Sequence, residues 1–383
     1  MDQSPKDLIT LIAVGDVSPN RDDPPSIFRH GGDLFRKADV VFGQMESPLS
    51  DRGTPNFVPH SPCKIPTKNV SALTQEGAGF DVMSFACNHA VDYGWEAFYD
   101  TLDILKKNKI ATVGAGRNIV EARKPVILEK EGVRIGFLGY LSIVFPGIIA
   151  EEDVPGCVPL RASHHYQQVD FQPGTPPLIV TTLYPEDKKA MEEDIRKLRP
   201  QVDVLVVSMH AGVHVVPSVI AMYQKEAAYH AIDTGADLVL QHHSHILKGI
   251  EMYKGKAIFY CLNNFALEYD RLRPNERKAW DLDYRKLFHD FYRVKIHPGY
   301  ERHRFHYDAL KSLVAKAYIQ NKKIQKVTYL PVYINPNLEP EVLGRNDSRA
   351  QEVFDYVAKI SEEQELNVRF SWEGDEVLIK GRS

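Results

Sequence analysis

Apolar runs that each end in polar side chains recur along the first two-thirds of this chain of 383 residues. The runs are continuous rather than alternating, which is typical of strands buried on both faces of a sheet. Stretches with helical spacing separate them, at 96–110, 188–200 and 221–235. This alternation predicts an α/β architecture with buried sheets. The expected strands lie within 7–16, 38–46, 80–90, 132–142, 202–212, 235–245 and 256–267.

Side chains capable of metal binding or proton transfer follow the carboxyl ends of these expected strands. In open α/β sheets, ligands bind at that edge. Carboxylate and amide oxygens combined with imidazole nitrogens suit divalent Mn, Zn, Fe or Co. A carboxylate that bridges two ions is typical of two-metal hydrolytic sites. The candidates are Asp16, Glu46, Asn88, His89, His210, His243 and His245.

The composition excludes several function classes. The net charge is near −4, and the most basic run, at 271–278, also carries Glu and Pro and is expected to be a solvated loop. We therefore expect no nucleic-acid partner. The four cysteines are widely spaced, which predicts buried free thiols in a reducing compartment. Because neither a signal peptide nor a membrane-length apolar run is evident, we expect a soluble, cytoplasmic chain without a membrane span.

The order of the motifs resembles the CapA family, metallophosphatase-like proteins of poly-γ-glutamate capsule synthesis within the calcineurin-like metallophosphoesterase superfamily. The resemblance spans residues 8 to 268. It implies a four-layer sandwich of two mixed sheets flanked by helices over 1–300, with a C-terminal α+β extension at 301–383 packed on it. The stretches that carry it are "AVGDVS" (13–18), "GQMESPLSDRG" (43–53), "VGAGRNIVEARKP" (113–125), "VVSMHAG" (206–212) and the longer segments 79–105 and 235–265.

The resemblance also implies metal ligands. Asp16 and His245 are similar to ligands of a first site, and Glu46 takes the place of the bridging carboxylate. Asn88, His210 and His243 are similar to ligands of a second site. One or two divalent ions per chain are therefore expected.

A proton-transfer pair is implied as well. His89 is similar to the histidine that contacts substrate or donates a proton. Asp92 either orients His89 or caps the following helix.

This chain departs from the family pattern near the expected site. Ser18 stands where the pattern D-x-H has histidine, and Cys87 precedes Asn88 where a second asparagine is common. Cys87 is either a soft thiol beside the site or a buried structural residue. In "HAGVH", Ala211 replaces an aromatic residue and His214 stands in a carboxylate position, while Asn263 replaces a glycine. Together these changes predict a substrate unlike that of the capsule proteins.

Further residues are candidates for substrate binding. Cys63 and Lys64 lie in a turn-rich stretch after Glu46, and Arg117 either binds a carboxylate or phosphate or is a solvated turn residue. The same role is expected for His214 and Asn264.

Three other histidines are not expected to be metal ligands. His242 is expected to support the ligands or face solvent. His164 and His165 are expected in a surface loop.

The C-terminal region contains no interpretable motif, but its elements can be predicted. Residues 302–319 are predicted to be a helix, 326–344 extended, 348–366 an amphipathic helix, and 367–381 a hairpin.

Four functions remain open at this point. The first is a metal-dependent hydrolase of a phosphoester or an amide, with His89 as acid or base. The second is a role in making or exporting poly-γ-glutamate, and the third is a metal-dependent peptide epimerase. The fourth, a non-catalytic module, is left open by Ser18. The expected ligand is accordingly a small molecule, a peptide or polyglutamate.

Overall fold

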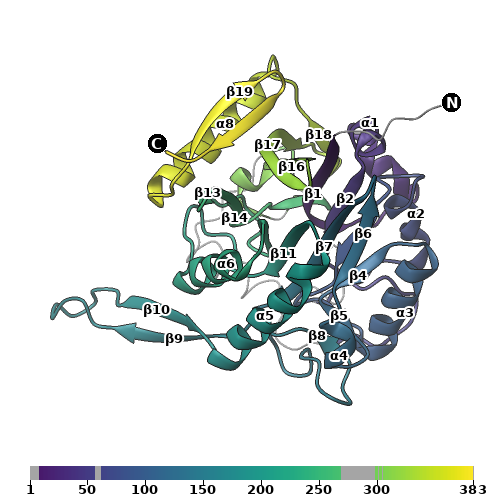
Figure 1. The fold of residues 1–383 in the computed structure, drawn as a ribbon, viewed down its shortest axis with the longest axis horizontal. Coiled ribbons are helices and arrows are strands. Elements are labelled where there is room, and N and C mark those ends of the chain that lie inside the picture. The colour runs from purple at the N-terminus through teal and green to yellow at the C-terminus, as the bar shows by residue number, and fades with distance from the viewer. Residues whose placement is uncertain (1–7, 57–61, 269–297, 301, 304, 383) are drawn as a thin grey trace.

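The computed structural model describes residues 8–56, 62–268, 298–300, 302–303 and 305–382. Within this part of the chain, two mixed β-sheets face each other and helices cover their outer sides (Figure 1). The expected solvated loop at 271–278 lies outside the described residues.

The larger sheet has ten strands among the described residues. In spatial order they are β19 (Arg369–Glu373), β20 (Glu376–Lys380), β17 (Lys323–Ile334), β16 (Lys311–Gln320), β1 (Ile9–Ser18), β2 (Val40–Met45), β3 (Val82–Ser84) and β4 (Ala111–Val113), with β15 (Asn264–Leu267) against β1 and β18 (Pro340–Val342) against β17. The run from β1 to β4 is parallel, whereas β16, β17, β20 and β19 are antiparallel to their neighbours.

The smaller sheet is built around four parallel strands with an antiparallel strand at each edge. In spatial order its strands are β13 (Ile250–Tyr253), β14 (Lys256–Phe259), β12 (Leu238–His242), β11 (Val204–His210), β7 (Val133–Leu141) and β6 (Val126–Lys130). Two short pairs lie outside both sheets: β5 (Ala115–Gly116) with β8 (Gly156–Cys157), and β9 (Ala162–Gln167) with β10 (Leu178–Leu183).

Helices connect these strands. In the described part of the chain they are α1 (Gly32–Lys37), α2 (Val70–Leu73), α3 (Gly94–Lys107), α4 (Ile119–Ala122), α5 (Pro185–Leu198), α6 (Met222–Thr234) and α8 (Ser348–Glu363), together with the 3-10 helices η1 (Pro24–Phe28), η2 (Thr67–Asn69), η3 (Arg199–Gln201) and η4 (Tyr307–Leu310).

Four layers result from the way these elements bury their apolar faces. Between the sheets, Phe42 of β2 stacks on Phe137 of β7 with the ring centroids 5.6 Å apart. The outer face of the larger sheet packs against α1, α2 and α3, where Phe35 and Phe98 are buried. Apolar residues of α5 and α6 join the core on the side of the smaller sheet. The predicted α/β sandwich of two mixed sheets flanked by helices is therefore confirmed.

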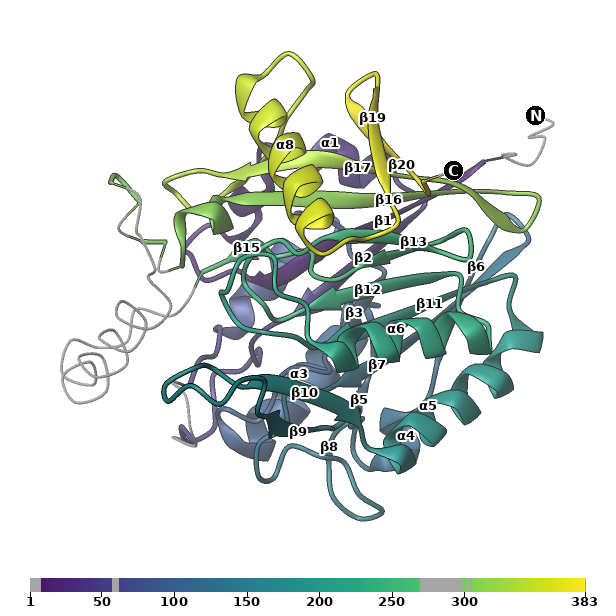
Figure 2. The ribbon, with the colours of Figure 1, turned by 90° about the vertical axis from the view of Figure 1, so that its left-hand side faces the viewer.

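The C-terminal region corrects one prediction. Residues 311–319, expected within a helix, belong to β16, which pairs with both β1 and β17. Alternate residues of "KSLVAKAYIQ" face the inter-sheet core, so the period-two pattern and two neighbouring strands override the helical propensity of its alanines and lysines. The extended stretch, the amphipathic helix and the terminal hairpin are confirmed as β17, α8 and β19–β20. Figure 2 shows α8 lying over β17.

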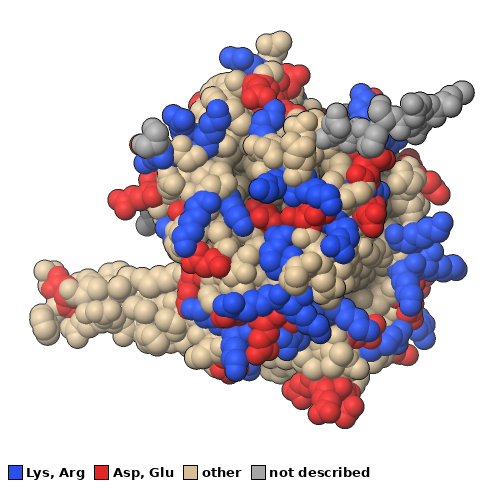
Figure 3. Space-filling view, viewed as in Figure 1, with Lys and Arg blue, Asp and Glu red and all other residues tan. Residues whose placement is uncertain are grey.

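A hairpin made of β9 and β10 projects from the body of the molecule (Figures 1 and 3). His164 and His165, expected in a surface loop, lie on its first strand and are exposed. Asp170 is the one charged residue in the segment 162–183, whereas Lys, Arg, Asp and Glu are interspersed over the rest of the face in Figure 3. Within the described residues, no helix combines the length and apolarity needed to cross a bilayer.

Strand β1 changes its pairing partner at Gly15, where the backbone of Asn263 comes close to it. Up to Ala13, β1 pairs with β16, and from Asp16 it pairs with β15. A Cβ on Gly15 would lie 1.7 Å from the Asn263 carbonyl oxygen, so only glycine permits this approach. Asn263 has φ 65°, a left-handed conformation that asparagine tolerates in place of the family's glycine. The side-chain amide of Asn263 donates to the carbonyls of Ala309 and Lys311, which ties β15 to the start of β16.

We expect Asn263→Gly to lower the free energy of unfolding by about 2 kcal/mol, because two buried carbonyls lose their donor. Asn263→Ala should cost roughly 1 kcal/mol more, since alanine is also strained at this φ. Chemical denaturation measures both values. Asn321→Gly, at an exposed turn with φ 51°, is the control and should change stability little. Equal costs for glycine and alanine at position 263 would contradict this account of the backbone.

Candidate metal centre

Three buried side chains from three strand ends form the middle of the candidate site. Asp16 belongs to β1, Glu46 directly follows β2, and His245 follows β12. His245 Nδ1 lies 3.5 Å from Asp16 Oδ2, and His245 Nε2 lies 3.4 Å from Glu46 Oε1. One donor atom from each residue lies within 4.8 Å of the other two. The two sheets therefore bring their carboxyl edges together at one cluster.

Burial shifts the pKa values of the ionisable groups in this cluster. Neither Asp16 carboxylate oxygen, nor Glu46 Oε1, has a hydrogen-bond partner among the described residues. Burial raises the pKa of Asp16 well above its usual value, and burial together with the nearby Asp16 charge does the same to the pKa of Glu46. Burial lowers the pKa of His245. A divalent cation is the kind of partner that favours the carboxylate forms in such a place.

A second group of donors faces the other oxygen of Glu46. His210, the last residue of β11, has Nε2 2.6 Å from Asn88 Oδ1 and 3.8 Å from Glu46 Oε2. The ring of His243 packs edge-on against that of His210, with centroids 4.9 Å apart. Glu46 consequently lies between two sets of nitrogen and oxygen donors.

Cys87 reconciles the two interpretations left open for it. Its thiol is fully buried and donates to the Glu46 backbone carbonyl at 3.1 Å and to Glu46 Oε2 at 3.4 Å. Burial raises its pKa well above the usual value. Cys87 is therefore a buried thiol beside the cluster, and its sulfur lies within 4.8 Å of donor atoms of Glu46 and His210.

His89 and Asp92 form a buried pair beside Glu46. His89 Nδ1 lies 2.6 Å from Asp92 Oδ2, which also accepts the Cys63 backbone N–H at 2.8 Å. His89 Nε2 lies 3.9 Å from Glu46 Oε1, so the ring is directed into the cluster. The alternative that Asp92 caps the following helix is wrong, because Tyr93 occupies that position before Gly94.

The outer side of His245 is enclosed by three residues. Asn264 Oδ1 lies 2.6 Å from His245 Nδ1, which orients the ring so that Nε2 points toward Glu46. Phe305 stacks on His245 with ring centroids 4.5 Å apart, and His214 packs edge-on at 5.0 Å. His214 also stacks on His243 at 5.3 Å. Two of the five predicted substrate-binding residues, His214 and Asn264, therefore lie at the cluster.

The backbone that carries these histidines adopts rare conformations. His243 and His245 have φ values of 89° and 49°. Positive φ is uncommon for residues other than glycine and is concentrated at functional sites. A tight turn after β12 thus aims both rings at the two carboxylates.

The loop bearing His214 is similarly strained and is held at three points. Val215 and Ser218 have φ values of 53° and 61°. The Val215 amide donates to the Ser244 carbonyl, the fully buried Lys248 Nζ donates to the Val216 carbonyl, and the Ser218 hydroxyl bonds the Glu363 carboxylate of α8. The C-terminal helix therefore contacts the loop that presents His214.

Two other predicted substrate-binding residues, Lys64 and Arg117, have contacts elsewhere. Lys64 Nζ donates to the Arg52 carbonyl and lies over the Tyr93 ring. Arg117 pairs with Asp103 of α3 at 2.7 Å and lies over the Tyr99 ring. Ser18 donates to Ser47 Oγ at 2.7 Å, and Ser47 in turn contacts Cys63 Sγ at 3.1 Å. Lys64 and Arg117 thus bond to residues outside the cluster, whereas Cys63 contacts Asp92 of the pair beside it.

Sequence reasoning missed several residues around the cluster. Phe305 and the buried His303 fall in the stretch predicted to be a helix, and Ser47 was overlooked because a lone serine after Glu46 carries no pattern. His242 is fully buried rather than solvent-facing, with Nδ1 3.8 Å from Asp16 Oδ1 and its ring against Phe42. The period of two along β12 could have indicated that His242 points opposite to His243.

The donor set fits divalent metal ions. Unpartnered carboxylate oxygens of Asp16 and Glu46 lie close to imidazole nitrogens, in a setting where burial disfavours an uncompensated charge. The hydrogen bond from His245 to Asn264 is of the kind that orients metal-ligating histidines.

Comparison with known proteins gives a family match over most of the chain. A family model described as "Bacterial capsule synthesis protein PGA_cap" matches residues 10–269. The "PGA biosynthesis protein CapA" of Bacillus subtilis (strain 168) is 28% identical over 279 residues, covering 70% of this chain and 66% of that protein. The "Capsule biosynthesis protein CapA" of Bacillus anthracis is 26% identical over 281 residues, covering 70% and 62%. The chain thus spans slightly less than two-thirds of the length of these relatives.

Solved structures are more distant. A hypothetical protein from Thermus thermophilus aligns with 84% of this chain and 98% of its own, at 11% identity and a TM-score of 0.45. The calcineurin-like phosphoesterase YfkN from Bacillus subtilis aligns with 93% and 97%, at 11% identity and a TM-score of 0.39. The description of the fold therefore rests on the sheet topology of this chain.

Because of Lys248, the free energy of unfolding should change with pH in the alkaline range. Burial lowers its pKa from 10.5 to about 8, so the folded state loses this proton before the unfolded state does. Stability should therefore rise between pH 8 and pH 10.5, by roughly 3 kcal/mol from this residue. Lys248→Met should remove that rise, as measured by denaturation at both ends of the range. Lys359→Met, at an exposed position of α8, is the control, and an unchanged pH dependence in Lys248→Met would refute the assignment.

Divalent metal binding should depend on the cluster and on pH. We expect elemental analysis to find one or two Mn or Zn per chain, with loading lost in Glu46→Ala and reduced in His243→Ala. Because the pKa values of Asp16 and Glu46 are raised, metal uptake should release protons and affinity should increase with pH. His165→Ala, on the exposed β9 strand, is the matched control. An unchanged metal content in both Glu46→Ala and His243→Ala would contradict the assignment of these residues as ligands.

Proposed function

Since the chain belongs to the bacterial capsule synthesis protein family PGA_cap, we propose that it is a metal-dependent hydrolase acting on a phosphoester or on an amide of peptide type. The proposal combines a family membership with a cluster of buried acid and imidazole groups. The membership alone names a biological process and no reaction.

One observation carries the proposal. Two fully buried carboxylates with unpartnered oxygens face histidines from a second sheet, at the carboxyl edge where α/β folds bind ligands. Burying such groups without compensation is costly, so a purely structural cluster is disfavoured. Asp16 and His245 would hold one ion, Asn88, His210 and His243 a second, and Glu46 would lie between them. When bound, such ions act as Lewis acids and lower the pKa of water.

His89 is the proposed proton-transfer residue. With Nδ1–H donated to Asp92, the Nε2 atom faces the cluster as an acceptor and becomes a donor once protonated. The Asp92 carboxylate holds the ring in place, and the same oxygen accepts the Cys63 backbone N–H. His89 can thereby give a proton to a leaving group or take one from an attacking group.

The enclosure of the cluster bears on the substrate. His214, in the carboxylate position of the family pattern, stacks on His243 and so adds an imidazole where an acid is expected. This substitution favours a substrate with acidic or neutral groups at that side. Phe305 closes the other side of His245 and restricts access of water.

A role in poly-γ-glutamate synthesis is the second candidate. It is favoured by the names of the Bacillus relatives and by that of a "Probable polyglutamine synthesis accessory protein" from Mycobacterium tuberculosis, which is 27% identical over 248 residues. In this role the amide bonds of a polyglutamate chain would be the substrate class.

Turnover of generic substrates by metal-loaded protein tests the hydrolase proposal. We expect hydrolysis of an aryl phosphate or of a γ-glutamyl amide with Mn or Zn. His89→Ala should lower kcat by roughly a hundredfold to ten-thousandfold while metal content stays unchanged. Asp92→Asn should lower kcat while metal content stays unchanged, because the contact that orients the His89 ring is weakened.

Controls separate the alternatives. His165→Ala should retain the full rate. Hydrolysis that is equally fast in His89→Ala would contradict the proton-transfer role. Solvent deuterium incorporation into a peptide without cleavage would favour the epimerase interpretation, and binding of polyglutamate without turnover would favour the capsule role.

A further inference from the structure

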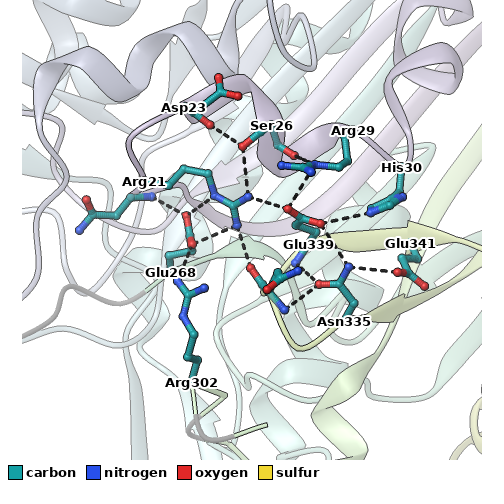
Figure 4. Close-up of polar contacts among 12 residues, drawn as sticks. Arg21, Asp23, Ser26, Arg29, His30, Glu268, Arg302, Asn335, Glu339 and Glu341 are labelled. Atoms are coloured by element: carbon teal, nitrogen blue, oxygen red, sulfur yellow. Dashed lines mark hydrogen bonds and ion pairs between the residues drawn. The ribbon is translucent and has the colours of Figure 1, made fainter. Parts of the chain in front are cut away.

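Arginines and carboxylates form a network around Glu268 and Glu339 (Figure 4). The buried Glu268 follows β15, and its amide donates to the Ser18 carbonyl at the end of β1. It is contacted by Arg21 and Arg302, and Arg21 reaches on to Glu339 in the loop before β18. The network thus joins the strand ends that bear the cluster to the C-terminal part of the larger sheet.

The inner part of this network is complete without Arg302. Arg21 donates Nε and Nη2 to the two oxygens of Glu268, at 2.9 and 3.0 Å, and its remaining N–H groups go to Glu339, Ser26 and the Asn337 carbonyl. This is the planar two-point pairing that suits arginine and a carboxylate. Both members of the pair are largely buried, with 13% and 2% of their side chains exposed.

Arg302 differs from Arg21 in exposure and in the use of its donors. Its side chain is 46% exposed, and its Nη2 donates to Glu268 Oε1 at 3.0 Å. Among the described residues this is the contact that fixes its guanidinium, which has five N–H groups in all. Three guanidinium groups, from Arg21, Arg29 and Arg302, contact the two carboxylates of Glu268 and Glu339. Arg29 contacts Glu339, whereas Arg302 is the half-exposed member that contacts Glu268, the carboxylate that follows β15.

Arg302 also borders the cluster itself. With Asn264, His303 and Phe305 it lines a small cavity of about 10 Å³, room for about one water molecule. Asn264 bonds His245, and Phe305 stacks on the same ring. Arg302 therefore lines the same cavity as two side chains that contact His245, on that side of the candidate centre.

We propose that Arg302 is an oxyanion subsite, which binds a carboxylate or phosphate group of the ligand beside the candidate metal centre while Glu268 fixes its orientation. This inference rests on the proposed function for the position of the reacting group. It adds the substrate class, a compound with an acidic group adjacent to the bond that is attacked. Arginine suits both oxyanions because its planar N–H groups match their geometry.

Direct binding of two probes tests the subsite. Inorganic phosphate and glutarate are titrated calorimetrically into metal-free and Mn-loaded protein at low ionic strength. Arg302→Gln should weaken the binding of at least one probe by about tenfold to a hundredfold, the range of a charge-assisted hydrogen bond. An effect on phosphate alone identifies a phosphate group as the ligand chemistry, and an effect on glutarate alone identifies a carboxylate.

Two further variants guard against misfolding. Arg302→Lys retains the charge but loses the planar fork, so binding should weaken less than in Arg302→Gln while the melting temperature stays that of the wild type. Arg196→Gln, at an exposed position of α5, is the matched control and should bind both probes normally. Unchanged affinity in both Arg302 variants, or the absence of probe binding by the wild type, overturns the proposal.

The two proposals fail in different ways. If the protein takes up no metal but binds an anion through Arg302 in the metal-free state, the hydrolase proposal fails and the subsite stands. If the protein takes up metal as expected but the Arg302 variants bind both anions with unchanged affinity, the subsite proposal alone fails.

Discussion

The burial of two carboxylates at the junction of two sheets is the constraint on which the rest of this structure depends. Asp16 and Glu46 are fully excluded from solvent, and both have pKa values raised by that burial. Such groups are stable in a fold only when cations, hydrogen-bond donors or protonation compensate them. The surrounding histidines, the Cys87 thiol and the strained turn at His243 to His245 are arranged around this requirement.

Strand β1 connects the site to the C-terminal part of the chain through its pairing with β15 and β16. Its first half pairs with the C-terminal β16 and its last residues pair with β15, so residues distant in sequence meet at Asp16. Gly15 permits the close approach, and Asn263 holds the crossing by bonding the carbonyls at the start of β16. The C-terminal region is also linked to the site through Glu363 of α8, which bonds the loop of His214, and through Glu339, which bonds Arg21.

The candidate site was largely predictable because its residues follow the ends of recognisable strands. Asp16, Glu46, Asn88, His210, His243 and His245 all lie together, as the resemblance to the CapA family implied, and the family match confirms that resemblance. Their roles as ligands stay a prediction. What the sequence could not indicate were partners supplied by distant segments. Phe305 and His303 come from a stretch predicted to be a helix, and Arg302 has meaning only next to Glu268 and Arg21.

By itself, the sequence determined the layered α/β class, the strand ends that carry the chemistry and the family, because continuous apolar runs and strand-end motifs are local patterns. Tertiary structure alone decided that residues 311–320 form a strand, since their pairing with β1 and β17 outweighs local helical propensity. It also decided that Lys64 and Arg117 engage Arg52 and Asp103 and that Asp92 serves His89 rather than a helix end. Contacts of this kind depend on where the chain returns in space, which no local spacing encodes.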